Sequence, residues 1–178
     1  MAADRSFQPA CFTATVSAGK ERLRVAWTNA GIAAIERATL RAKRELEGRL
    51  RMRLVEKRFP AALREGLQAA ARGKADAVPL DLDWAREFER DVLMAARTIP
   101  YGETRSYSWL ARAARRPLAV RAAASVMARN PLWLLVPCHR VVYADGRIGP
   151  YGRNGNARKR ELLAREGVRL KTREHIKT

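Results

Sequence analysis

Residues 121–142 read RAAASVMARNPLWLLVPCHRVV, and this stretch organises the second half of the chain. Its alanine-rich first part favours a helix, which the Asn130-Pro131 pair ends because the residue before a proline avoids the helical conformation. The apolar run that follows carries Cys138 beside His139. The chain has only two cysteines and two histidines, so this pair joins its candidate nucleophile to a candidate base.

Outward from this stretch, the sequence predicts one further helix before it and places the start of the alanine-rich helix. Ser106 can cap a short helix that extends through Ala113, and Arg115-Arg116-Pro117 breaks the chain before a helix over 118–129. Two short helices joined by a tight turn suggest a helix-turn-helix motif. Helical hairpins are common, so this feature alone leaves DNA binding open.

The first part of the chain has an α/β pattern. Partial alternation in 11–17 and 23–27, with turns at Gly19-Lys20 and 29–31, predicts a three-stranded antiparallel meander that ends with 32–35. Residues 40–58 predict a helix, since Leu46, Leu50 and Leu54 recur at helical spacing, and 60–73 predict a second helix that begins at Pro60.

An extended connector over 75–83 marks the boundary between two expected domains, residues 1–80 and 81–178. Asp83 can cap the first helix of the second domain. The apolar stripe of that helix contains Trp84, Phe88 and Val92.

The charge of the chain favours a polyanionic partner. The net charge is +18, and residues 101–178 contribute +12 of it, with 17 Lys or Arg against 5 Asp or Glu. Such a field favours nucleic acid first and an anionic membrane surface second. No stretch is long and apolar enough for a membrane span, and the N-terminus has no signal-peptide pattern, so we expect a cytoplasmic protein.

The cysteine and histidine content excludes two kinds of site. Cys11 and Cys138 form no disulfide framework, and two histidines with two cysteines do not match the usual zinc spacing. We therefore expect no metal and no cofactor. His175, near the C-terminus, is expected on the surface.

Four sequence blocks together resemble the O6-alkylguanine-DNA alkyltransferases. They are 99–107 (IPYGETRSY), 121–131 (RAAASVMARNP), 136–141 (VPCHRV) and 161–167 (ELLAREG). The resemblance is close over about residues 85–170, whereas residues 1–80 fit only as a topology. It implies an N-terminal ribonuclease-H-like domain, with the three-stranded antiparallel sheet and helices, and a mostly helical C-terminal domain that contains the helix-turn-helix.

The resemblance also implies a repair protein, a methylated-DNA–[protein]-cysteine methyltransferase. Such a protein flips O6-alkylguanine out of duplex DNA, since the alkyl group is out of reach inside the duplex, and moves it irreversibly to its own cysteine. Cys138 would be the acceptor. Its proton would pass through a water to His139, which Glu166 would orient, and Tyr107 would press on the 3′ phosphate and donate a proton to the base.

Further residues take roles from the same resemblance. Arg121 would enter the base stack from the minor groove, on a helix whose bare face includes Ala119, Ala122 and Ala124. Asn130 would link this helix to the active-site segment. The base pocket would be lined by Val141, Tyr151, Gly152 and Arg153. Gly152 replaces a serine that is frequent in the family, and the alanines replace paired glycines, but Cys138 is present, which indicates an active protein.

We expect the partner to be double-stranded DNA with O6-alkylguanine, bound in the minor groove by a monomer, with cooperative binding left open. The site of action would then be cytoplasmic and nucleoid-associated, or nuclear in a eukaryote. Two alternatives remain: a sensor that recognises alkylated guanine without repairing it, and a cysteine hydrolase. The motif residues argue against the first, and the lack of a second suitable histidine argues against the other.

Overall fold

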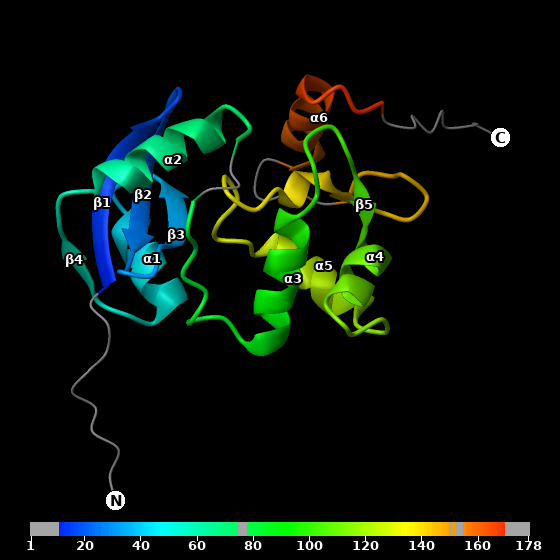
Figure 1. The fold of residues 1–178 in the computed structure, drawn as a ribbon, viewed down its shortest axis with the longest axis horizontal. Helices are drawn as coiled ribbons and strands as arrows, with labels where there is room; N and C mark the ends of the chain where they lie inside the picture. Colours follow the sequence, from blue (N-terminus) through cyan, green and yellow to red (C-terminus); the bar gives the residue numbers. More distant parts are fainter. Residues whose placement is uncertain (1–10, 75–77, 150, 152–154, 170–178) are drawn as a thin grey trace, which may run out of the picture. The chain divides into compact units, whose positions relative to one another are not determined.

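The structure is a computed structural model that describes residues 11–74, 78–149, 151 and 155–169 (Figure 1). In this part of the chain two compact units can be distinguished. The first contains the residues up to Trp84 together with Pro131–Leu135, and the second contains Ala85–Asn130 together with the residues from Val136 onward. The chain thus leaves the second unit after Asn130 and returns to it just before Cys138.

Four strands form the sheet of the first unit, in the order β3-β2-β1-β4 (Figure 1). The antiparallel strands β1 (Cys11–Ala18), β2 (Glu21–Trp27) and β3 (Ile32–Arg37) confirm the predicted meander. The predicted three-stranded sheet is nevertheless incomplete, because β4 (Leu54–Glu56) pairs with β1 in parallel.

The sequence pattern predicts a helix where β4 lies, because Leu54 continues the helical spacing of Leu46 and Leu50. Helix α1 (Ala42–Leu50) ends at Arg51, whose left-handed backbone (φ 54°) turns the chain out of the helix. The carboxylate of Glu47 then accepts a hydrogen bond from the Leu54 backbone N–H at 3.0 Å. Leu46, Leu50 and Leu54 are buried in one apolar cluster, so the spacing reports a shared core and not one continuous helix.

A helix and two segments that pair with β3 complete the first unit. Helix α2 (Ala61–Ala71) follows Pro60 as predicted. The connector then pairs with β3: Ile32 N–H donates to the Pro79 carbonyl at 2.9 Å, and Asp81 N–H donates to the Ile32 carbonyl at 3.0 Å. Farther along the same strand, Ile35 N–H donates to the Pro131 carbonyl at 2.8 Å, which ties 131–135 to this unit.

The second unit is mostly helical (Figure 1). Its elements are α3 (Glu87–Arg97), β5 (Arg105–Ser106), α4 (Tyr107–Ala113), α5 (Val120–Ala128), a 3-10 turn at Cys138–Arg140, β6 (Val141–Val142) and α6 (Gly155–Arg165). Strands β5 and β6 pair in parallel. The predicted cap at Ser106 is confirmed, since its hydroxyl accepts from the Trp109 N–H at 3.1 Å. No helix within the described residues has the length and apolarity to cross a membrane.

The cap predicted at Asp83 is wrong. Helix α3 begins only at Glu87, with Arg86 at the capping position. The Trp84 indole N–H instead donates to the Asp81 carbonyl at 3.0 Å, and its ring packs against the apolar cluster of the first unit. Trp84 therefore ends the connector and does not start the helical stripe.

Replacing Gly31 by alanine tests the pairing of the connector with β3. Gly31 has φ +148°, and a Cβ there would lie 2.4 Å from the Pro79 carbonyl oxygen, so we expect Gly31→Ala to lower the free energy of unfolding by about 2 kcal/mol or more. Urea denaturation measures it. Gly48→Ala is the matched control: it lies inside α1 with no atom near its Cβ, and we expect it to stabilise by about 0.5–1 kcal/mol. Equal effects would contradict this account.

Candidate active site

The end of helix α5 positions Cys138. Asn130 follows the helix, and its side-chain N–H donates to the Val136 carbonyl at 2.9 Å. The Cys138 backbone N–H donates to the same carbonyl at 2.8 Å, which closes a tight turn at Pro137. Cys138 and His139 both lie in a 3-10 turn. Cys138 is 6% exposed.

The surroundings of Cys138 oppose ionisation on balance. Burial raises the pKa of its thiol, while a hydrogen bond with the Asn130 side chain, the charge of Lys159 and a hydrogen bond with Tyr151 lower it. Burial outweighs the other effects, so the resting cysteine is a thiol. A base is therefore needed to form the thiolate that acts as a nucleophile.

His139 supplies a candidate base whose tautomer is set by Glu166. His139 Nε2 lies 2.7 Å from Glu166 Oε1, and both side chains are buried. An ionised carboxylate only accepts hydrogen bonds, so Nε2 carries the proton and donates. His139 Nδ1 is buried without a hydrogen-bond partner among the described residues. Its lone pair is thus available to accept a proton.

Arg140 keeps Glu166 ionised. Its guanidinium grips the carboxylate with two hydrogen bonds, Nε to Oε2 at 2.9 Å and Nη2 to Oε1 at 3.1 Å, and its Nη1 donates to the Ile99 carbonyl at 2.7 Å. The Gly102 backbone N–H also donates to Oε2, at 3.2 Å. Burial alone would raise the pKa of Glu166, but the hydrogen bonds from His139 and Arg140 lower it to about 2.

The structure brings Tyr107 close to the segment after β6. Tyr107 is buried, its ring lies 5.4 Å from that of Tyr143, and burial first, then Tyr143 and Cys138, raises its pKa to about 12. Its hydroxyl therefore keeps its proton at neutral pH. A Cβ on Gly149 would lie 2.5 Å from this hydroxyl, so only glycine leaves room for the ring.

Two of the four predicted pocket residues lie in the described part. Val141 is buried in β6, and the Tyr151 ring stands edge-on to His139 with centroids 6.5 Å apart. Gly152 and Arg153 lie outside the described residues, as does His175.

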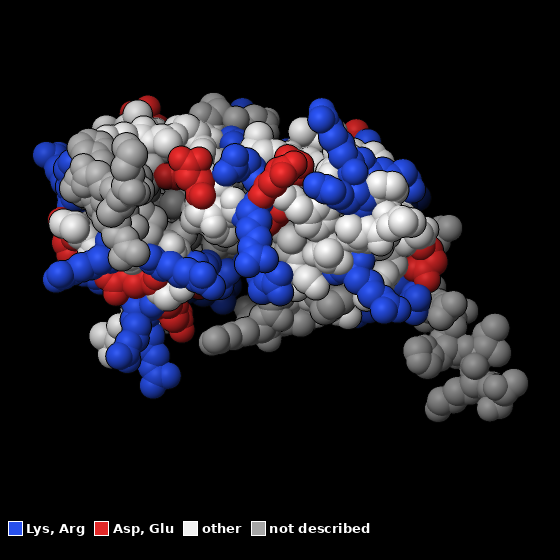
Figure 2. Space-filling view, turned by 90° about the horizontal axis from the view of Figure 1, so that it is seen from below, with Lys and Arg blue, Asp and Glu red and all other residues white. Residues whose placement is uncertain are grey.

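The predicted DNA-contacting residues lie on α5 and at its start. Arg121 and Ala122 are exposed, and Ala119 and Ala124 are half-buried. Arg121 forms no ion pair with any residue that the structure describes. Figure 2 shows Lys and Arg side chains spread over one face of the molecule, with fewer acidic side chains between them.

Two site residues were missed from the sequence. Arg140 is part of the Cys-His-Arg run, so its charge beside the candidate pair was the available signal. Lys159 lies on α6, fully buried, and donates to the Val141 carbonyl at 2.5 Å. It precedes the buried Leu163 by one helical turn, a spacing that places both on the inner face of the helix.

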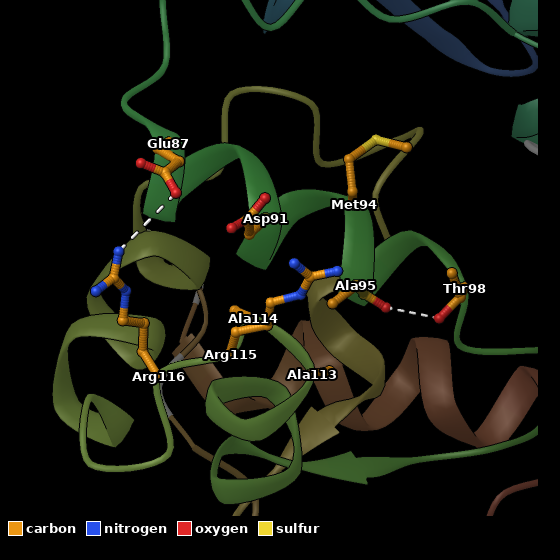
Figure 3. A pocket seen from close by; sticks show the side chains of 9 residues that line it. All are labelled: Glu87, Asp91, Met94, Ala95, Thr98, Ala113, Ala114, Arg115 and Arg116. Atoms are coloured by element: carbon orange, nitrogen blue, oxygen red, sulfur yellow. Dashed lines mark hydrogen bonds and ion pairs between the residues drawn. The ribbon is translucent and has the colours of Figure 1, made fainter.

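A separate cavity of about 570 Å³ lies between α3 and the turn that joins α4 to α5 (Figure 3). None of the predicted site residues lines it. Glu87 and Arg116 form an ion pair at 3.9 Å at its edge, and the Thr98 hydroxyl donates to the Ala95 carbonyl. This cavity is therefore separate from the surroundings of Cys138.

Comparisons with known proteins give a consistent result. Residues 87–168 match the family model described as "6-O-methylguanine DNA methyltransferase, DNA binding domain". The crystal structure of the Mycobacterium tuberculosis O6-methylguanine methyltransferase superposes on this chain with a TM-score of 0.66 and a sequence identity of 31%. The match covers 88% of this chain and 92% of that one. A complex of the M. tuberculosis protein with DNA is 29% identical, with a TM-score of 0.64 over 85% and 90%.

Curated relatives match over the second half of the chain. The bifunctional transcriptional activator/DNA repair enzyme Ada of Escherichia coli is 51% identical over 89 residues, half of this chain and 25% of that protein. The methylated-DNA–protein-cysteine methyltransferase of Mycolicibacterium paratuberculosis is 44% identical over 103 residues, 57% of this chain and 62% of that one. The chain thus spans between a quarter and about three fifths of these two relatives.

The pKa of Glu166 predicts how stability depends on pH. A carboxyl that ionises near pH 2 when folded, against 4.5 ordinarily, stabilises the fold above about pH 4.5, and this contribution disappears as the pH falls toward 2. We expect Glu166→Gln to lower the free energy of unfolding by about 2–3 kcal/mol at pH 7, and by roughly half as much near pH 3. Urea denaturation at both pH values measures the difference.

Glu161→Gln is the control for this experiment. Glu161 lies on the same helix and pairs with Arg158 and Arg165, but it is exposed. We expect a small change at neutral pH. A Glu166→Gln effect that did not vary with pH would show that the lost group acts by its shape and not by its charge.

Proposed function

The chain belongs to the O6-methylguanine-DNA methyltransferase family, and we propose that it repairs DNA by moving the alkyl group of O6-alkylguanine to Cys138. The observation that carries the proposal is the buried pair of Cys138 and His139, with Glu166 bound to Nε2 and Nδ1 left without a partner. Such a pair can form a thiolate inside a buried site.

The reaction that we propose has one alkyl transfer and three proton transfers. His139 Nδ1 takes the proton of the Cys138 thiol through a bridging water, and Glu166 stabilises the imidazolium that results. The thiolate attacks the alkyl carbon, a sulfur–carbon bond forms, and the bond from that carbon to guanine O6 breaks. The electron pair moves into the base, and Tyr107, which is protonated at neutral pH, donates its proton toward the base. The proton that His139 holds then reaches the Tyr107 phenolate through solvent. Guanine is restored, and the thioether on Cys138 ends the activity after one turnover.

Base extrusion is the second part of the proposal. Helices α4 and α5 act as a helix-turn-helix, and the small side chains of Ala119, Ala122 and Ala124 let α5 approach the minor groove. The exposed Arg121 enters the stack in place of the damaged nucleotide. The flipped base then lies between the Val141 backbone and Tyr151, with Gly152 and Arg153 completing the pocket.

The other parts of the chain serve this reaction. Asn130 links the recognition helix to the cysteine by its bond to Val136. We propose that the first unit is a ribonuclease-H-like domain with a structural role, and that a monomer binds duplex DNA through phosphate contacts, with weak sequence preference and strong dependence on salt. Because the proposed substrate is DNA, we propose that the protein acts in the cytoplasm of a prokaryote or in the nucleus of a eukaryote.

The mass of the intact protein tests the alkyl transfer. After incubation with duplex DNA that carries O6-methylguanine, we expect one added methyl group in the wild type and none in Cys138→Ala, with Cys11→Ala as the matched control that still gains the group. Binding without a mass change would identify a sensor of alkylated guanine instead. Release of a free product over many turnovers would identify a hydrolase.

The Arg121→Ala variant tests extrusion separately from chemistry. We expect it to slow repair of duplex DNA by about 10- to 100-fold, because extruding a base costs a few kcal/mol. Reaction with free O6-benzylguanine should keep its wild-type rate, since a free base needs no extrusion. Arg44→Ala, which removes one exposed arginine from α1, is the charge-matched control. Equal losses on both substrates would refute the role of Arg121.

A further inference from the structure

Lys159 is the largest fully buried side chain among the described residues. Its ammonium nitrogen donates to the Val141 carbonyl at 2.5 Å and lies 5.8 Å from the centroid of the Tyr107 ring. Both neighbours belong to the site in which Cys138 reacts. A lysine placed this deeply is uncommon, because its charge must leave water.

No carboxylate within the described part of the chain pairs with Lys159. The carboxylate of Glu166 in the same site is already bound by His139 and Arg140. Tyr107 offers no anion either, since burial raises its pKa to about 12. Carbonyl and ring contacts compensate a buried ammonium only in part.

Cys138 is the group that can supply the missing negative charge. Lys159 and Cys138 act on one another: the lysine lowers the pKa of the thiol, and the cysteine raises the pKa of the ammonium, which burial lowers to about 8. Removing a proton from the thiol would therefore give the buried ammonium an opposite charge in the same site. The thiolate gains the same stabilisation.

We propose that Lys159 is the counter-ion of the Cys138 thiolate and at the same time fixes the Val141 carbonyl at the base pocket. This role rests on the proposed alkyl transfer and adds a positioning residue to it. His139 removes the proton, and Lys159 stabilises the anion that remains. A carbonyl oxygen has two lone pairs, so the bond to Lys159 leaves one free for an amino group of the flipped base.

The groups that face this pair determine how its charge responds to pH. They are Tyr107 from α4, His139 from the 3-10 turn, and Tyr143 and Tyr151 from the segment after β6. Tyr107 stays neutral up to about pH 12. The rise of the reaction rate with pH therefore reports the ionisation of the Cys138 thiol beside Lys159, and not the ionisation of the Tyr107 phenol.

Three variants test the counter-ion, each compared with the wild type. Lys159→Met keeps the length of the side chain but removes the charge, Lys159→Arg keeps the charge, and Arg160→Met removes an exposed charge from the neighbouring position of α6. The rate of reaction with free O6-benzylguanine is measured by intact mass from about pH 6 to about pH 10. Thermal unfolding of every variant accompanies the rates.

We expect Lys159→Met to move the rise of the reaction rate to higher pH by about one to three pH units. The rate at neutral pH should then fall by about tenfold or more, and it should recover at high pH. Lys159→Arg should keep the wild-type profile at a reduced rate, and Arg160→Met should match the wild type. A Lys159→Met variant with an unshifted profile, whether slow or fast, would overturn the proposal, because a packing role changes the rate at every pH alike.

A second probe separates this proposal from the proposed function. Modification of Cys138 by iodoacetamide, followed on its own peptide so that Cys11 does not contribute, needs no guanine and no DNA. Its pH profile should shift in Lys159→Met as the transfer profile does. If the wild type showed no alkyl transfer while this shift remained, the repair function would fail and the ion pair would stand. The absence of the shift would overturn the counter-ion whatever the transfer assay showed.

Discussion

The carboxylate of Glu166 holds the reactive part of the molecule together. It accepts hydrogen bonds from His139, from Arg140 and from the Gly102 backbone, so it joins the end of α6, the turn at Cys138 and the loop after α3. Four contacts to one buried anion leave it little freedom to move or to take a proton. The orientation of His139, and with it the position of the free Nδ1, follows from that constraint.

Charges alternate through the site in an order that suits thiol chemistry. Arg140 neutralises Glu166, Glu166 supports a proton on His139, and Lys159 stands without a carboxylate on the side of Val141. The neutral resting thiol protects Cys138 from chance oxidation, because only the thiolate reacts readily. In the mechanism that we propose, the thiolate forms only when His139 takes the proton and Lys159 supplies the opposite charge.

The sequence predicted most helices and the meander, because each depends on local spacing. It failed where tertiary contacts decide. The spacing of Leu54 fits both a helix and a core strand, and the left-handed turn at Arg51 chooses between them. The role of Glu166 was predicted only from the family resemblance, because no local sequence pattern connects it to His139, which lies 27 positions earlier. The sequence pattern did not identify Lys159 as a site residue, because lysine is rarely buried in a protein core.

The segment Pro131–Leu135 links the two units by more than a single crossing of the chain. It lies between α5 and Cys138 in sequence, yet it bonds to β3, and its Leu132 and Leu135 are completely buried. A fragment that starts at Ala85 would keep every reactive side chain but lose the strand against which this segment rests. Dissecting the protein at the obvious linker would therefore leave apolar residues uncovered a few positions from the nucleophile.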